Sequence, residues 1–133
     1  MIGTNPEFDG FISDHRWAVL STLRKDGHPV SSWVAYARDG DTLIVSTPGT
    51  TFKRRSLERD PRLTLCVSSD AAPFNFVSVE GTATIETERL MELTQMVFAN
   101  IDYEEPKDLQ NWLDTQQRVI IRLHPTRVSG VIR

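Results

Sequence analysis

Basic residues crowd into one short stretch of a chain that is acidic overall. Five of the ten residues from Lys53 to Arg62 are Lys or Arg, whereas the 133-residue chain carries 15 basic and 18 acidic residues, a net charge of −3. Lys53, Arg54 and Arg55 follow Thr51, a residue type that caps helix N-termini. Cations at the positive end of a helix dipole cost about 0.3–1 kcal/mol each, and a bound anion reverses that sign. The stretch therefore predicts a phosphate site where cations and free backbone N–H groups converge.

Hydroxyl side chains lie just before the basic stretch. Ser46, Thr47, Thr50 and Thr51 would add hydrogen-bond donors to a bound phosphate. The alternative is a solvated helix face on which Glu58 pairs with nearby basic residues. The sequence alone is consistent with both a phosphate site and a solvated helix face.

A second candidate for ligand contact is the run Ser31-Ser32-Trp33. Consecutive serines are poor core residues in a strand, so their backbone and hydroxyl groups could face the edge of a planar heterocycle. Trp33 could then flank that ring or pack in a subunit interface. The alternative is an ordinary two-faced strand with one serine pointing outward.

Several other kinds of site are not indicated. His15, His28 and His124 are scattered singly, so we expect no metal site. Cys66 alternates with Leu65 and Val67, which favours a small buried residue. A single cysteine fits a reducing cytoplasm. The net negative charge disfavours a nucleic-acid partner, and no apolar run approaches the roughly 20 residues that cross a membrane.

The elements that must position these residues are mostly short strands. Segments 16–23, 29–37 and 42–46 are predicted to form an antiparallel meander, with tight turns at Asp26-Gly27 and Asp39-Gly40. A helix is predicted from Phe52 to about Arg59, because Pro61 ends it. Further strands are predicted over 63–69, 74–85, 118–123 and 126–132, and further helices from Thr87 and over 106–115.

Two details of the later strands and helices are also predicted. Gly81 indicates a bulge or bend in the strand 74–85, and His124-Pro125 is expected to end the strand that begins at Arg118. Leu90, Leu93, Val97 and Ile101 form one apolar stripe on the second helix. Six or seven mostly antiparallel strands with two or three helices indicate an α+β fold with a β-barrel core, because closure removes exposed edges. We expect residues 1–133 to form one domain.

The order and spacing of several segments resemble a known family. These segments are Trp17–Leu23, Asp26–Pro29, Gly40–Leu43, Ser46–Pro48, Lys53–Arg62, Val79–Ala83 and Arg118–Arg122. Together they are similar to the pyridoxamine 5′-phosphate oxidase-like split β-barrel proteins. The three segments between Gly40 and Arg62 resemble the actinobacterial branch that uses the deazaflavin coenzyme F420.

The resemblance implies an FMN-binding type of split barrel that forms a homodimer, with the cofactor at the subunit interface. Lys53 and Arg55 take the places of the family's phosphate-binding residues. The cofactor-binding residues are thus expected to be Val30, Ser31, Ser32, Trp33, Ser46, Thr47, Thr51, Lys53, Arg54 and Arg55. No catalytic side chain is expected, since the cofactor carries the chemistry.

Three functions follow as expectations. The first is a cytoplasmic oxidoreductase that transfers a hydride between F420 and a small organic acceptor. The second is an FMN-dependent oxidoreductase of the same fold, although not pyridoxamine phosphate oxidation itself. The third is a protein that binds a flavin or haem without turnover, because the cations at Lys53 would serve binding equally well.

Overall fold

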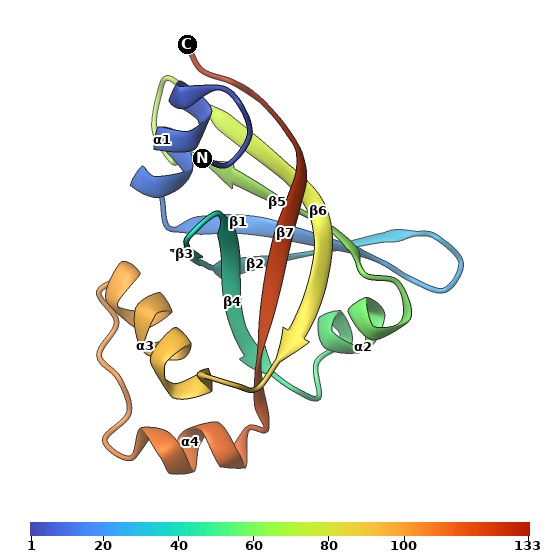
Figure 1. The fold of residues 1–133 in the computed structure, drawn as a ribbon, viewed down its shortest axis with the longest axis vertical. Coiled ribbons are helices and arrows are strands. Elements are labelled where there is room, and N and C mark those ends of the chain that lie inside the picture. The colour runs from blue at the N-terminus through green and yellow to red at the C-terminus, as the bar shows by residue number, and fades with distance from the viewer.

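One antiparallel sheet of seven strands curls into a partly open barrel and carries four helices (Figure 1). The computed structural model describes all residues from 1 to 133. This architecture confirms the predicted α+β split β-barrel. The strands are β1 (Trp17–Leu23), β2 (Pro29–Ala35), β3 (Ala37–Asp39), β4 (Thr42–Pro48), β5 (Arg62–Ser68), β6 (Phe76–Glu86) and β7 (Arg118–Val131), and the helices are α1 (Pro6–Asp14), α2 (Phe52–Arg59), α3 (Leu90–Asn100) and α4 (Leu109–Thr115).

The predicted meander of the first strands is wrong. β1 and β2 form the predicted hairpin, but the segment 29–37 breaks at Tyr36, whose N–H donates to the Arg16 carbonyl oxygen at 3.1 Å. β3 then pairs with β4 at the opposite edge of the sheet, whose strand order is β2-β1-β5-β6-β7-β4-β3. β2 and β3 are thus the two edge strands of the sheet although they follow one another in the sequence. The curl of the sheet makes this possible, and no local sequence pattern shows it.

β7 continues through the point where the sequence predicts its end. Gly81 pairs with Pro125 while Glu80 pairs with Arg127, so Thr126 is the extra residue of a bulge. The predicted bulge at Gly81 is confirmed, and the predicted end of the strand at His124-Pro125 is wrong. A proline, which has no N–H to donate, is tolerated in a strand where a bulge interrupts the pairing.

The main core fills the inner face of the sheet. Leu65 and Val67 of β5 belong to it, whereas Cys66 points to the outer face and is only half-buried, so its predicted burial is wrong. α1 closes one end of the barrel through Phe11 and Ile12. The prediction missed α1, although Asn5 caps it by accepting from the Glu7 N–H.

α3 covers part of the outer face of the sheet. Its stripe packs Leu93 and Val97 against Ile44 of β4 and Ile120 of β7. The stripe is therefore buried within the chain. The helix begins at Leu90 rather than Thr87, because Arg89 adopts a left-handed conformation with φ 56°.

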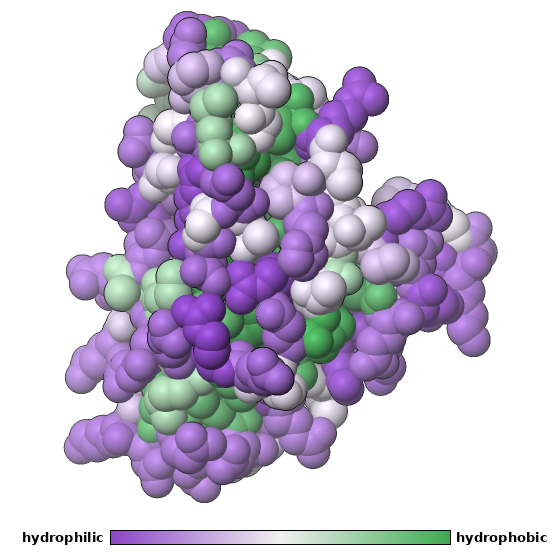
Figure 2. Space-filling view, viewed as in Figure 1, coloured by the Kyte–Doolittle hydropathy of each residue, from purple (hydrophilic) through white to green (hydrophobic).

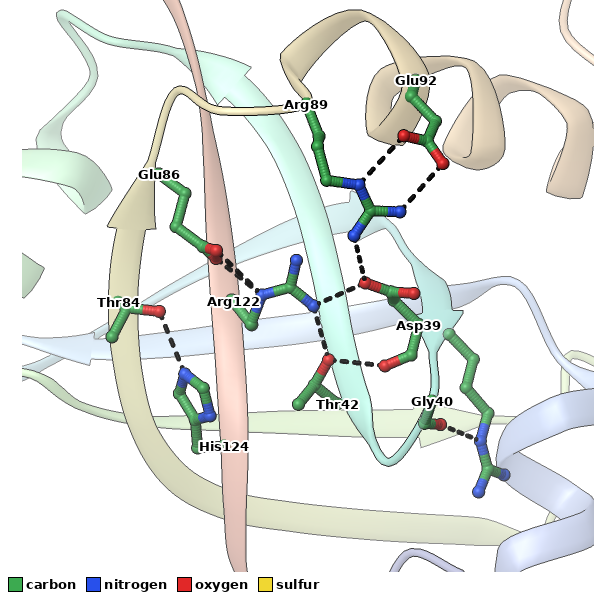
Figure 3. Close-up of polar contacts among 10 residues, drawn as sticks. Asp39, Gly40, Thr42, Thr84, Glu86, Arg89, Glu92, Arg122 and His124 are labelled. Carbon is green, nitrogen blue, oxygen red and sulfur yellow. Dashed lines mark hydrogen bonds and ion pairs between the residues drawn. The ribbon is translucent and has the colours of Figure 1, made fainter.

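A network of charged side chains joins β7 to the β3–β4 hairpin and to α3 (Figure 3). Arg122 donates to Glu86 at 2.6 Å and to Asp39 at 2.8 Å. Arg89 contacts the same Asp39 carboxylate at 3.5 Å and pairs with Glu92. Every cation of this network therefore has a carboxylate partner.

Hydrophilic side chains cover most of the face shown in Figure 2, and hydrophobic atoms reach that surface only in small areas between them. None of the helices combines the length and the hydrophobicity that crossing a membrane requires.

Candidate functional site

The end of β4, the start of α2 and the start of β7 meet at one end of the molecule (Figure 1). The Gly49 N–H donates to the Gln117 carbonyl oxygen at 2.8 Å. A Cβ atom on residue 49 would clash with that same oxygen, so only glycine permits this approach. The close approach brings α2, which begins at Phe52 as predicted, beside Arg118, the first residue of β7.

The N-terminus of α2 has no side-chain cap. Thr51 occupies the N-cap position, but its hydroxyl donates to the Pro48 carbonyl oxygen at 3.0 Å. The predicted capping hydrogen bond from the helix to Thr51 is therefore wrong. The first-turn N–H groups of α2 remain available, and such groups bind anions.

Lys53 and Arg118 are half-buried cations without an acidic partner. Burial lowers the pKa of Lys53, and the nearby Arg118 guanidinium lowers it further. Burial also lowers the pKa of Arg118. None of the ion pairs in the protein includes Lys53, Arg55 or Arg118. A bound anion would supply the missing negative charge.

Three contacts from within the chain fix the Arg118 side chain. The guanidinium lies over the Trp112 ring, 4.2 Å from its centroid. Its Nε donates to Gln116 Oε1 at 2.8 Å, and its Nη1 donates to the Ser46 carbonyl oxygen at 3.0 Å. All three partners are uncharged, whereas Arg122, four residues along the same strand, contacts two carboxylates.

Arg118 is the residue that the sequence reasoning missed as a site candidate. Its one sequence signal is an arginine placed directly before the apolar run Val119-Ile120-Ile121. That signal does not separate Arg118 from an ordinary surface arginine.

Of the two predicted arginines, Arg54 is engaged within the chain. Its Nη2 pairs with Glu58 at 2.9 Å and its Nη1 donates to the Gly49 carbonyl oxygen at 3.1 Å. The alternative in which Glu58 pairs with the basic stretch thus holds for Arg54 alone. Arg55 is exposed to solvent.

Ser46 and Thr47 point to opposite faces of β4, as neighbours on a strand do. The Ser46 hydroxyl lies 3.0 Å from the Thr94 hydroxyl of α3. The Thr47 hydroxyl is buried and lies 3.4 Å from the Thr51 hydroxyl. The predicted hydroxyl groups therefore do not converge on one point. Ser46 contacts Arg118 through its backbone carbonyl oxygen and not through its hydroxyl group.

The predicted ring-contacting residues lie on β2, an edge strand. Val30 and Ser32 pair with residues of β1 that face the barrel interior, whereas Ser31 and Trp33 lie on the outer face. Trp33 is 75% exposed and meets the Trp17 ring edge-on, with centroids 5.7 Å apart. No hydrogen bond or ring contact joins these four residues to Lys53, so within one chain the predicted site falls into two groups.

Comparisons with known proteins show what the whole chain is similar to. The family model described as pyridoxamine 5′-phosphate oxidase matches residues 4–132. The solved structure of the conserved hypothetical protein Rv2991 from Mycobacterium tuberculosis is similar, with a TM-score of 0.80 and 24% identity over 98% of this chain and 85% of that one. A structure named F420 reductase has a TM-score of 0.79 and 22% identity, over 95% of this chain and 98% of that one.

A heme-binding protein from Mycobacterium smegmatis shares the same fold, with a TM-score of 0.76 and 19% identity over 97% of this chain and 55% of that one. At these identities the solved structures establish the fold. The family model spans nearly the whole chain, and this chain therefore belongs to the pyridoxamine 5′-phosphate oxidase family.

Proposed function

We propose that this protein is an oxidoreductase that transfers a hydride between the coenzyme F420 and a small organic acceptor. The observation that carries the proposal is the pair of half-buried cations, Lys53 and Arg118, beside an uncapped helix N-terminus. Both features favour a bound anion, and the phosphate-bearing tail of a flavin-type coenzyme supplies one.

The residues present fit such a coenzyme. Lys53, Arg118 and the first-turn N–H groups of α2 would hold the anionic tail, and Arg55 would meet it from the solvent side. Val30 to Trp33 would contact the ring system, by resemblance to the family. When bound, the coenzyme supplies the hydride chemistry, and the chain supplies position and electrostatic field.

F420 stands first because the stretch from Gly40 to Arg62 resembles the F420-using branch, and a structurally similar protein is named F420 reductase. FMN is the second candidate, because its phosphate presents the same chemistry to Lys53 and Arg118. A binding protein without turnover is the third. It is favoured by the similarity to a heme-binding protein, since haem propionates are also anions.

Titration of the purified protein with F420, FMN and haemin distinguishes these candidates. We expect F420 to bind with a change in its fluorescence, and the reduced coenzyme to be oxidised in the presence of a panel of small acceptors. Tight FMN binding with no response to F420 would replace the first candidate with the second. Binding of F420 without turnover by any acceptor would favour a binding protein.

Replacement of Lys53 tests the site itself. Lys53→Ala should weaken coenzyme binding by about 1.5–3 kcal/mol, the contribution of a hydrogen bond to a charged group. Lys107→Ala, which removes an exposed lysine of the α3–α4 connection, is the matched control. An unchanged dissociation constant for Lys53→Ala would remove this lysine from the site.

We also propose that the protein is a homodimer with the coenzyme at the subunit interface. The family resemblance supports this arrangement, and so does the exposure of Trp17 and Trp33 on the outer face of the sheet. These two rings line an open groove of about 830 Å³. Large apolar side chains gathered on one exposed face are typical of interaction surfaces.

A further inference from the structure

Arg118 is held in a fixed orientation largely by α4 and by the residue that follows it. α4 supplies Trp112 beneath the guanidinium, and Gln116, which follows α4, accepts from Nε. Figure 1 shows α4 at one end of the molecule, at the start of β7, with α2 on the other side of that strand. α2 and α4 thus lie on either side of the two cations, Lys53 and Arg118.

Aromatic contacts stiffen this support. The Trp112 ring lies 5.6 Å from the Phe98 ring of α3, and the Phe98 ring lies 5.0 Å from that of Tyr103. The Trp112 carbonyl oxygen also accepts from the Gln116 N–H at 3.1 Å, which ties the end of α4 to the residue that holds Nε. The Arg118 side chain is therefore positioned before any ligand arrives.

The hydrogen bonds of Arg118 leave part of its guanidinium free. Nε and Nη1 donate within the chain, whereas Nη2 makes no hydrogen bond there. Arg118 also lies close enough to Lys53 to disfavour its charge, so the two cations repel one another. A preorganised arginine with one free terminal nitrogen beside a second cation is an arrangement suited to contact an anion.

We infer that Arg118 is an anion-contacting residue of this site and that, with Lys53, it selects a coenzyme tail carrying two negative charges. This inference rests on the proposed function. A single negative charge would neutralise only one of the two cations and leave the other half-buried without a partner, which is costly. A phosphate monoester, as in FMN, carries close to two negative charges near neutral pH, and a tail with a phosphodiester and carboxylates, as in F420, carries at least two.

Two pairs of compounds measure this selection. FMN is compared with riboflavin, which lacks the phosphate, and F420 with its deazaflavin core, which lacks the anionic tail. The ratio of the two dissociation constants in a pair isolates the contribution of the tail. We expect Arg118→Gln to reduce this ratio by about tenfold or more for the pair that binds. Arg127→Gln, an exposed arginine on the same strand, should leave it unchanged.

A structural role for Arg118 predicts a different result. If Arg118→Gln only disturbed packing on Trp112, both members of a pair would lose affinity equally, and that result would overturn the inference. Arg118→Lys keeps the charge but not the fixed guanidinium, so it should recover part of the lost preference. A lysine variant that behaves like Arg118→Gln would show that charge does not select the tail, and would also overturn it.

Failure of the proposed function can be told apart from failure of this inference. If neither pair of compounds binds, the coenzyme assignment falls, and inorganic pyrophosphate then tests Arg118 alone. The inference expects pyrophosphate to raise the Tm of the wild-type protein and to raise that of Arg118→Gln much less. Equal shifts in both proteins, or no shift in the wild type, would overturn it.

Discussion

Lys53 keeps its charge in a half-buried position without a carboxylate, so its protonation is coupled to whatever binds beside it. Burial and Arg118 lower the pKa of the free lysine, and a bound anion would raise it again. Coenzyme affinity should therefore fall as the pH rises from neutral through this lowered pKa, because the lysine loses its proton and with it the attraction for the tail.

The variant Lys53→Arg tests this coupling, because a guanidinium stays protonated across the range. We expect its coenzyme dissociation constant, measured by fluorescence titration from neutral pH to about pH 10, to change much less than that of the wild type. A parallel loss of affinity in both proteins would assign the pH dependence to another group.

The lowered pKa of Lys53 also affects the stability of the protein without ligand. The unfolded chain holds the lysine proton up to the ordinary pKa of 10.5, whereas the folded protein releases it earlier. Lys53 therefore opposes folding at neutral pH, and this cost is relieved between the lowered pKa and 10.5. Lys53→Met, which removes the charge, should raise the urea midpoint at pH 7, and a lowered midpoint would contradict the account.

Ser56 is a second residue whose surroundings predict a change in stability. This residue of α2 is fully buried, and its hydroxyl has no hydrogen-bond partner. Ser56→Ala removes an unsatisfied polar group, so we expect the protein to gain about 1 kcal/mol of unfolding free energy in urea denaturation. Ser69→Ala is the contrasting variant, because the Ser69 hydroxyl accepts from the Asn75 N–H at 3.0 Å, and its loss should destabilise the protein.

The sequence predicts a cationic cluster, but not which cations stay unpaired. Within the basic stretch, Arg54 pairs with Glu58, Arg62 pairs with Asp60, and Arg59 donates to the Leu23 carbonyl oxygen. These partners depend on side-chain directions and on a distant strand. Only the fold brings Lys53 near Arg118, which lies 65 residues further along the chain. No local pattern encodes this proximity.

At the scale of elements, the loop from β4 to α2 sets the distance between the two cations. Gly49 allows this loop to run against Gln117, the residue before Arg118. In Gly49→Ala the added Cβ would clash with the Gln117 carbonyl oxygen, so the loop and the start of α2 must shift away from β7. We expect coenzyme affinity to fall by about tenfold or more, in line with the sensitivity of such sites to small displacements.

Gly10→Ala provides the control for this prediction. A Cβ at Gly10 meets no atom within 4 Å, and the residue lies inside α1. This substitution should stabilise the protein by up to about 1 kcal/mol and leave coenzyme binding unchanged. Dissociation constants and melting curves of the two variants separate a shifted site from a general loss of stability, and equal affinities would contradict the proposed role of Gly49.

Prediction of the elements succeeds where the signal is local. α2 lies within the predicted bounds because Thr51 and Pro61 limit it, and Gly81 marks a real bulge. The signals for α1 are local too, with Asn5 as cap and Pro6 in the first turn, but the prediction did not use them. The continuity of β7 through Pro125 depends instead on its partner strand, because the bulge opposite accommodates the proline.

At the scale of the whole molecule, the curl of the sheet leaves one outer face partly uncovered. α3 covers the region around Ile44 and Ile120, whereas the outer face of β1, β2, β5, β6 and β7 carries no helix in its apolar part. Cross-strand pairing places Trp33 beside Val19, and Val19 beside Cys66. With Phe76 paired to Val131 on the last two strands, these residues form one outer apolar face, made of Trp17, Val19, Trp33, Cys66, Phe76 and Val131.

The proposed homodimer would use this outer apolar face. A tryptophan that is 75% exposed is unusual on a monomer, and an exposed apolar sheet face can pack against its own copy about a two-fold axis. Light scattering after size-exclusion chromatography should give twice the mass of the chain for the wild type. The double variant Trp17→Ser, Trp33→Ser should run as a folded monomer, because it removes the two largest apolar side chains from the face.

Cys66 offers an independent readout of the same interface. It is half-buried in the single chain and would become covered in the dimer, so a thiol reagent should modify it slowly in the wild type and faster in the double tryptophan variant. Tyr103→Ser, which removes an exposed ring from the α3–α4 connection, should change neither the mass nor the rate of modification. A double variant that stays dimeric while its Cys66 reacts rapidly would place the interface elsewhere, because a dimer through this face covers the thiol.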